Sequence, residues 1–356
     1  MVSVSLCMIV RDEEQVLSRC LNSVREAVDE IVIVDTGSLD RTKEIAWKYT
    51  DRVFDFVWRD DFSAARNYAF SRASKEYCMW LDADDVLTPA NVGKLLRLKE
   101  NLQPEVDMVM MPYITAFDPD GSPAFSYFRE RIVKNSPQFR FQGRVHEAIP
   151  RSGYVIFADI PVEHRKEKAQ DGGRNLRIYR QMRAAGEPMD GRSMYYYGRE
   201  LLTHGEYEEG IGILRDFLNR SDGWVENKID ATRQLARCFY GLGKEEEALE
   251  ALLAGLKYDA PRGETCCDLG RHFLDRGKYR QAAYWYRQAL EAEKMMDTGA
   301  FVQEECYGFL PAISLCVCYD RMGMRKEAEY YNELAGKYRP QSPYYLQNKE
   351  YFEREG

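Results

Sequence analysis

Short apolar segments alternate with amphipathic ones through the first part of the chain. Four apolar runs have the length of strands, and each is followed by residues with apolar positions at helical spacing. Strands of nearly continuous apolar character separated by helices predict a parallel sheet with helices on both faces. The predicted strands lie at residues 4–10, 31–34, 53–57 and 77–81, and the predicted helices at 16–24, 40–49, 63–73 and 89–102.

The pattern becomes less regular after this region. An apolar strand is expected at residues 108–113, and residues 117–123 contain the aspartate, glycine and proline residues typical of turns. Residues 125–133 and 138–141 then read as short antiparallel strands.

From about Gly191 the pattern is helical and contains an internal repeat. Four glycines each follow a helical segment, with one small residue seven positions before and another five positions after. Such spacing lets paired helices approach closely and resembles the tetratricopeptide repeat of about 34 residues. Four pairs would stack into a solenoid with a concave face, and the alternative is an irregular helical bundle. The glycines are Gly205, Gly243, Gly277 and Gly323, and the small residues are Gly198, Ala236, Gly270, Cys316, Gly210, Ala248, Ala282 and Ala328.

Length and composition agree with this division. A chain of 356 residues with 45% hydrophobic residues is long enough for two cores, and we expect an α/β domain at residues 1–187 and an all-α repeat domain at 188–356. The formal net charge of -8 argues against binding to nucleic acid phosphates or to an anionic membrane surface.

The nine cysteines lack the spacing of a zinc site and read as reduced core residues. The N-terminus has no basic leader, and no apolar run reaches the roughly 18 residues of a membrane span. We therefore expect a cytoplasmic protein without integral membrane association.

Three carboxylates directly follow the predicted strand at residues 77–81. Asp82, Asp84 and Asp85 are close enough to repel one another, and a divalent cation such as Mg²⁺ or Mn²⁺ is the usual way to offset such repulsion. The alternative is a solvated acidic turn. Polar residues also follow Val10 and Val34, and the carboxyl ends of parallel strands meet at one edge, where ligands bind.

The surrounding sequence argues against two other interpretations of the aspartates that follow the predicted strands. Asp35 begins the letters of an aspartic protease signature (DTGS), but a predicted helix follows and no second copy exists. An EF-hand starting at Asp82 would need glycine and glutamate where this chain has Leu87 and Gly93.

Four ordered motifs carry a family resemblance. They resemble the successive signatures of a family 2 glycosyltransferase of the GT-A fold, over roughly residues 1–185. The C-terminal repeats resemble those of bacterial members that combine this domain with tetratricopeptide repeats, including peptide glycosyltransferases that act on bacteriocin precursors. The motifs are residues 6–14 (LCMIVRDEE), 33–40 (IVDTGSLD), 62–67 (FSAARN) and 80–85 (WLDADD).

The resemblance implies an inverting, metal-dependent transfer from a nucleotide sugar, most often a UDP-sugar. It assigns Asp82 to the ribose or sugar, and it assigns the Mn²⁺ or Mg²⁺ on the diphosphate to Asp84 with His164 as a further ligand. Asp85 is expected only to cap the segment that follows. Many members have two aspartates where this chain has Asp35 and Thr36, which leaves the base contact open. The remaining nucleotide-sugar residues are Val10, Arg11, Glu13, Asp35, Thr36, Arg66 and Ala83.

An inverting transfer also needs a base that deprotonates the acceptor. The resemblance points to the segment 144–147 (RVHE) near the acceptor site, with Glu147 as the expected base and His146 as the alternative.

The function predicted from these features is transfer of a sugar to a peptide or protein side chain held in the repeat-domain groove. The repeats would otherwise join two copies into a homodimer. The alternatives are transfer to a lipid-linked or cell-surface glycan, and a non-catalytic protein that binds partners through its repeats.

Overall fold

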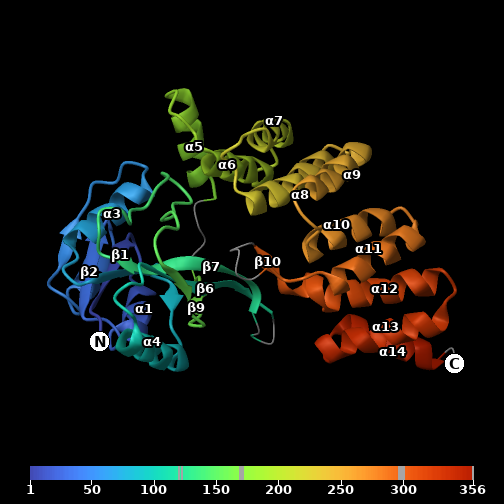
Figure 1. Cartoon of the computed structure of the whole chain (residues 1–356), viewed down its shortest axis with the longest axis horizontal. Helices are drawn as coiled ribbons and strands as arrows, with labels where there is room; N and C mark the ends of the chain where they lie inside the picture. The colour runs from blue at the N-terminus through green and yellow to red at the C-terminus, as the bar shows by residue number, and fades with distance from the viewer. Residues whose placement is uncertain (119–120, 122, 168–171, 296–300, 355–356) are drawn as a thin grey trace. The chain divides into compact units, whose positions relative to one another are not determined.

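The computed structural model describes residues 1–118, 121, 123–167, 172–295 and 301–354 (Figure 1). The chain divides into two compact units, Met1–Pro188 and Met189–Gly356. An α/β unit is followed by an all-α unit, which confirms the predicted fold class.

A mixed β-sheet forms the centre of the first unit. The strand order is β3-β2-β1-β4-β7-β6-β9-β5, with β8 beside β6. Strands β1 to β4 run parallel, whereas β7 is antiparallel to both β4 and β6. The strands are β1 (Val4–Val10), β2 (Glu30–Asp35), β3 (Val53–Asp55), β4 (Tyr77–Trp80), β5 (Asp85–Val86), β6 (Met108–Phe117), β7 (Pro123–Lys134), β8 (Val155–Phe157) and β9 (Val162–His164). The helices are α1 (Leu17–Val24), α2 (Thr42–Ala46), α3 (Phe62–Arg72), α4 (Pro89–Asn101) and α5 (Arg174–Ala184).

Helices cover both faces of this sheet, as the continuous apolar strands predicted. In β1, Leu6 and Met8 pack into a core cluster that contains Leu17 of α1, while Cys7 faces a second cluster with Phe70 of α3. Successive side chains of a strand point to opposite faces, so a strand buried on both sides must be apolar throughout.

The residues around Thr88 predict the start of α4 correctly. The side chain of Thr88 caps α4 by accepting a hydrogen bond from the Asn91 N–H, and Pro89 occupies the first turn. The helix predicted at residues 40–49 is shorter, because only Thr42–Ala46 is α-helical and turns follow it.

The strand predicted at residues 138–141 is wrong. The segment is irregular, and the Asn67 amide replaces a strand partner by donating to the Phe141 carbonyl and accepting from the Phe141 N–H, each at 2.9 Å. The strand predicted at 125–133 forms part of β7 and is antiparallel to β6, as expected. Part of the turn predicted at 117–123 lies outside the described residues.

The second unit consists of paired helices, which confirms the tetratricopeptide-like repeats and excludes an irregular bundle (Figure 1). The four turn glycines all have φ between +66° and +74°, where a side chain would be strained. A Cβ on Gly198 would meet the Leu214 side chain at 2.5 Å, so this helix pair requires a glycine. The helices are α6 (Gly191–Thr203), α7 (Tyr207–Leu218), α8 (Val225–Gly241), α9 (Glu245–Ala254), α10 (Gly263–Leu274), α11 (Tyr279–Glu291), α12 (Phe309–Arg321), α13 (Arg325–Tyr338) and α14 (Pro343–Arg354). Two 3-10 helices, η1 (Gly255–Lys257) and η2 (Glu304–Tyr307), and the short strand β10 (Val302–Gln303) complete the unit.

The cysteines agree with the sequence analysis. All nine are free thiols and buried. Among the described helices none combines the length and the apolar character that crossing a bilayer requires.

Candidate active site

The polar residues after β1, β2 and β4 meet at one edge of the sheet, as the parallel pattern predicted. The ends of β1 and β2 are joined directly, because the Val10 carbonyl accepts hydrogen bonds from the Thr36 N–H at 2.9 Å and from Thr36 Oγ1 at 3.1 Å. Val10, Asp35 and Thr36 are buried. These three residues are buried and connected by hydrogen bonds, and they form the floor of the candidate site at the ends of β1 and β2.

Asp35 leaves one oxygen unused on this floor. Its Oδ2 accepts hydrogen bonds from the N–H groups of Gly37 and Ser38, each at 3.0 Å. Its Oδ1 is buried and has no hydrogen-bond partner among the described residues. Buried acceptors are normally satisfied, so this oxygen fits a donor from a ligand, such as an N–H of a base or a ribose hydroxyl.

The loops that follow β1 and β2 are joined to each other by hydrogen bonds at this end of the site. Asp12 adopts a left-handed φ of 54°, its N–H donates to Ser38 Oγ at 2.9 Å, and its carboxylate accepts from the Leu39 N–H at 2.7 Å. The Glu13 N–H donates to Thr42 Oγ1 at 2.6 Å. Glu13 is half-buried, whereas Arg11 is exposed at the outer rim.

Arg66 connects Asp82 to Glu147. Its Nη2 lies 2.6 Å from Asp82 Oδ1, and its Nε lies 2.5 Å from Glu147 Oε1. Its guanidinium also lies 4.6 Å from the centre of the Trp80 ring, within the range of a cation–π contact. Helix α3, whose first turn is capped by the Asp61 carboxylate, places Arg66 at this point.

The charges around Asp82 keep this carboxylate ionised. Burial alone would raise its pKa, but the positive charges of Arg66 and Arg131 outweigh burial and lower the pKa of Asp82 to about 2. Burial lowers the pKa of the Arg66 guanidinium, but Asp82 and Glu147 outweigh that effect and raise it.

Strand pairing brings His164 to the acidic turn. Strand β5 is antiparallel to β9 with Asp85 opposite His164, and His164 Nδ1 lies 3.2 Å from both Asp84 Oδ1 and Asp85 Oδ1. Burial lowers the pKa of His164, but hydrogen bonds to Asp84 and Asp85 outweigh it and raise the pKa to about 10. The two carboxylates thus create the negative potential that a cation site requires.

Asp84, Asp85 and His164 offer a suitable set of metal ligands. One ligand atom from each lies within 4.8 Å of the others. Two carboxylate oxygens and an imidazole nitrogen suit Mn²⁺, and the carboxylates alone suit Mg²⁺. The donor set therefore fits the cation that the sequence predicted.

The expectation that Asp85 only caps the next segment is wrong. Asp85 is completely buried, its Oδ2 lies 3.1 Å from Arg131 Nη1, and its Oδ1 accepts a hydrogen bond from the Tyr113 hydroxyl at 2.9 Å. Its Oδ2 also accepts from the Asp82 N–H at 3.0 Å. Asp85 therefore fixes the shape of the whole acidic turn.

Sequence reasoning missed the arginines behind this turn. The guanidinium groups of Arg129 and Arg131 lie 4.8 Å and 4.0 Å from the centre of the Trp80 ring. Arg131 is fully buried, and Arg129 pairs with Glu130. Charged residues within the otherwise apolar strand β7 are the signal that could have found them.

Glu147 and His146 face different surroundings. Glu147 is 8% exposed, and its Oε1 is held by Arg66, while no hydrogen bond within the described part of the chain engages its Oε2. The backbone of His146 has a left-handed φ of 52°, and its ring stacks against Tyr179 of α5 at 6.4 Å. The structure thus joins Glu147 to the Asp82 network.

The predicted residues fall into three neighbouring groups. Asp82, Arg66 and Glu147 form one connected network, and Asp84, Asp85 and His164 form the cation site. Ala83 is buried between the two aspartates. The third group is the floor at the ends of β1 and β2, with Glu13 and Arg11 on its rim.

Part of the chain is similar in sequence to known glycosyltransferases and to a repeat-containing protein. Residues 5–153 match the family model described as glycosyl transferase family 2. A TPR repeat-containing protein of Synechococcus elongatus is 39% identical over 155 residues, covering 43% of this chain and 36% of that protein. The SPbeta prophage-derived glycosyltransferase SunS of Bacillus subtilis is 27% identical over 225 residues, covering 60% of this chain and 52% of SunS.

A further relative is the lipopolysaccharide core biosynthesis glycosyltransferase LpsC of Rhizobium meliloti. It is 34% identical over 163 residues, which cover 42% of this chain and 58% of LpsC. The chain therefore spans about half the length, or less, of the first two relatives and under two thirds of the third.

Proposed function

We propose that this chain, whose residues 5–153 match the family 2 glycosyl transferases, transfers a sugar from a UDP-sugar to a peptide or protein side chain, with inversion and with Mn²⁺ or Mg²⁺. The observation that carries the proposal is the Asp82, Arg66 and Glu147 network directly beside Asp84, Asp85 and His164. A cation site for a diphosphate and a carboxylate for the acceptor are thus adjacent.

The floor at the ends of β1 and β2 would hold the nucleotide. The unpartnered Oδ1 of Asp35 would accept from the base or the ribose, and the rigid Val10 and Thr36 pair would define the depth of the pocket. Glu13 and Arg11 would contact the nucleotide from the rim. Asp82, held ionised by Arg66, would accept hydrogen bonds from the sugar or ribose hydroxyls, with Ala83 beside it.

Asp84 and His164 would hold the cation, and Asp85 would complete the site from its buried position. When bound, the cation would stabilise the negative charge that develops on the diphosphate as the bond to the sugar breaks. Arg131 and Tyr113 keep Asp85 in place, so the ligands are oriented in advance.

Glu147 is the proposed base. Arg66 fixes the carboxylate through Oε1 and leaves Oε2 to accept the proton of the acceptor. His146 remains the alternative, because its left-handed backbone lies next to Glu147.

The repeat unit would hold the acceptor, because stacked helix pairs form extended surfaces that suit an extended peptide. A role in joining two copies is the competing use of the same surface. The free, buried thiols and a nucleotide-sugar donor support a cytoplasmic location for the reaction.

Two other functions compete with this one. Transfer to a glycan is favoured by the similarity to LpsC, whose name assigns it to lipopolysaccharide core biosynthesis. A non-catalytic binding protein would need its acidic site to be unused, and the completeness of the Asp84, Asp85 and His164 set argues against that.

A panel of UDP-sugars tests the proposal. UDP release is measured for each donor with Mn²⁺, with Mg²⁺ and with EDTA, and mass spectrometry then follows sugar addition to candidate peptides. We expect metal-dependent release with one donor. Calorimetry with UDP separates the alternatives, because a protein that binds no UDP with or without Mn²⁺ is not this enzyme.

A further inference from the structure

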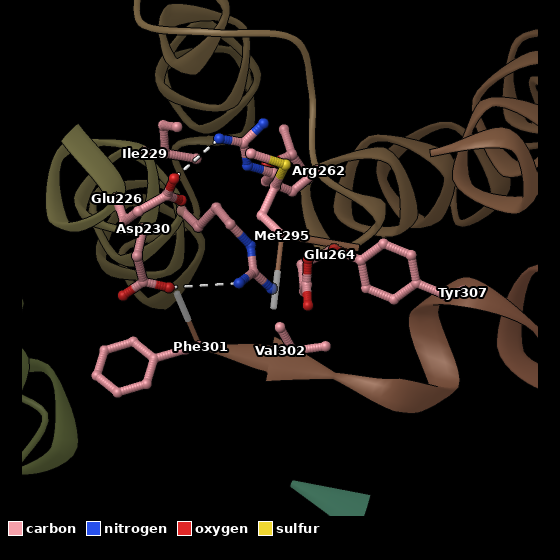
Figure 2. Close-up of a pocket in the computed structure, with 11 residues that line it drawn as sticks. Glu226, Ile229, Asp230, Arg262, Glu264, Met295, Phe301, Val302 and Tyr307 are labelled. Atoms are coloured by element: carbon pink, nitrogen blue, oxygen red, sulfur yellow. Dashed lines mark hydrogen bonds and ion pairs between the residues drawn. The ribbon is translucent and has the colours of Figure 1, made fainter. Parts of the chain in front are cut away.

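A pocket opens within the repeat unit, and none of the residues that line it belongs to the candidate active site. Figure 2 shows it between α8, the start of α10 and the segment at residues 301–307. The space between the side chains that line it amounts to about 370 Å³ when the open solvent at its mouth is included. Three carboxylates and two arginines line it together with apolar side chains.

Both arginines already have carboxylate partners. Arg262 Nη2 lies 2.9 Å from Glu226 Oε1 (Figure 2). Arg233 lies 3.3 Å from an oxygen of Asp230 and 2.6 Å from one of Asp268. The positive charges in the wall are therefore neutralised within the unit.

Glu264 differs from Glu226 and Asp230, the other two carboxylates of the pocket, because each of those pairs with an arginine. Its side chain is buried, with the residue 3% exposed, and its two oxygens accept hydrogen bonds from the Gln303 N–H and the Tyr307 hydroxyl, each at 2.7 Å. Both donors are neutral, and within the described residues Glu264 forms no ion pair. Burial raises its pKa, although the two hydrogen bonds and the positive charge of Arg233 oppose the effect. Buried carboxylates are normally paired directly with a cation, whereas Glu264 feels the charge of Arg233 without forming an ion pair with it.

A second unsatisfied group lies beside it. Thr265 is 1% exposed and lines the same pocket, yet its Oγ1 has no hydrogen-bond partner among the described residues. A buried hydroxyl without a partner costs free energy unless a ligand satisfies it. Glu264 and Thr265 thus offer two neighbouring acceptors to one donor group.

We propose that this pocket binds the ammonium group of a lysine side chain on the acceptor peptide. An ammonium carries three donors around a compact charge, which suits the Thr265 hydroxyl and the free lone pairs of Glu264. An arginine fork fits less well, because both Glu264 oxygens already accept a hydrogen bond. Ile229 and Val302 in the wall offer apolar surface to the lysine stem.

Charge complementarity also favours a cationic ligand, since the chain has a formal net charge of -8. The inference rests on the proposed function only in taking the bound peptide to be the acceptor. Binding itself does not depend on transfer, so the two can fail separately.

Fluorescence anisotropy of the full chain with labelled acetyl-GGSGKGSGG-amide tests the site. The same peptide with norleucine, arginine or glutamate in place of lysine provides the comparison. We expect the lysine peptide to bind at least about tenfold more tightly than the norleucine peptide, as for a buried charge pair. Glu264→Gln should remove that preference, and Thr265→Val should reduce it.

Glu246→Gln is the matched control, because it removes one exposed carboxylate outside the pocket. Equal binding of the lysine and norleucine peptides would overturn the inference, as would full lysine preference in both pocket variants. Circular dichroism reports whether each variant folds. If Glu264→Gln does not fold, Thr265→Val provides the test of the pocket. Lysine preference in Asp84→Asn, which should lose transfer, would support the pocket independently of the catalytic proposal.

Discussion

Both units bury arginine–carboxylate pairs, but they assemble them in different ways. In the first unit Arg66 and Glu147 are 81 positions apart, and Asp85 and His164 are 79 apart. In the repeat unit the buried polar contacts recur near the repeat length. Tyr195 to Asp230 and Arg233 to Asp268 each span 35 positions, and Glu226 to Arg262 spans 36.

The difference follows from architecture. In stacked repeats each helix pair contacts its neighbours, so a polar contact links equivalent positions of successive repeats. In the mixed sheet the strand order determines which residues meet, and β7 pairs with β4 and β9 pairs with β5 although each pair is distant in sequence. Loss of one pair should therefore affect catalysis in the first unit and only local stacking in the second.

Asp84→Ala should have the largest effect. Removing a cation ligand should lower metal-dependent donor hydrolysis and transfer by at least about 100-fold, the scale of losing a key electrostatic contact in the transition state. The rate of UDP release with excess Mn²⁺ measures this loss of activity. Asp159→Ala, which removes an exposed carboxylate paired with Lys94, is the control and should leave the rate unchanged. Full activity of the Asp84 variant would refute the mechanism.

Glu147→Gln should lower transfer by about 10² to 10⁴, the usual contribution of a general base. Calorimetric UDP binding should be spared, because glutamine can still accept the hydrogen bond from Arg66. His146→Gln is the comparison. A normal rate for the Glu147 variant together with a loss for the His146 variant would transfer the role of base to His146.

Arg66→Met should destabilise the first unit by about 3–5 kcal/mol, because it leaves Glu147 and Asp82 without their shared cation. Denaturant unfolding monitored by tryptophan fluorescence measures it, since Arg66 lies against Trp80. We expect the repeat unit to unfold as in the unaltered chain. Loss of both units in one transition would contradict the expectation that the change affects the first unit alone.

Arg233→Met is the corresponding change in the repeats and should cost less, about 1.5–3 kcal/mol, the range for a hydrogen-bonded charged group. Asp230 keeps its contacts with Tyr195 and Gln234, and Asp268 is 30% exposed and can reach water. Far-ultraviolet circular dichroism during denaturation should show the loss, with donor hydrolysis unchanged. Arg271→Met removes an exposed ion pair with Asp275 at the end of α10 and should have little effect on either quantity.

Gly243→Ala should have the smallest effect, about 1 kcal/mol, the cost of placing a side chain in the left-handed region. Its φ is +69° and no atom lies within 4 Å of the added Cβ, so backbone strain is the whole cost. Gly270→Ala is the contrast, because its Cβ would meet the Tyr286 ring at 2.8 Å. Thermal unfolding should rank the Gly270 variant well below the Gly243 variant.

The sequence alone predicted the features that depend on local pattern. Apolar strands and amphipathic helices placed the parallel part of the sheet and its polar edge, and the glycine spacing placed the repeats. The segment at 138–141 was predicted wrongly, because its backbone bonds to the Asn67 side chain instead of to a strand.

The sequence by itself determined the α/β unit, the repeats and the acidic turn after β4. Each of these features depends on the spacing of residues that are close together in the sequence. Only the tertiary structure decided that Asp85 is a buried anchor for Arg131, that Arg66 ties Asp82 to Glu147, and that Glu264 is buried against neutral hydrogen-bond donors in a pocket of the repeat unit. These contacts depend on strand order and on the packing of successive helices, which bring together side chains whose separation along the chain carries no local signal.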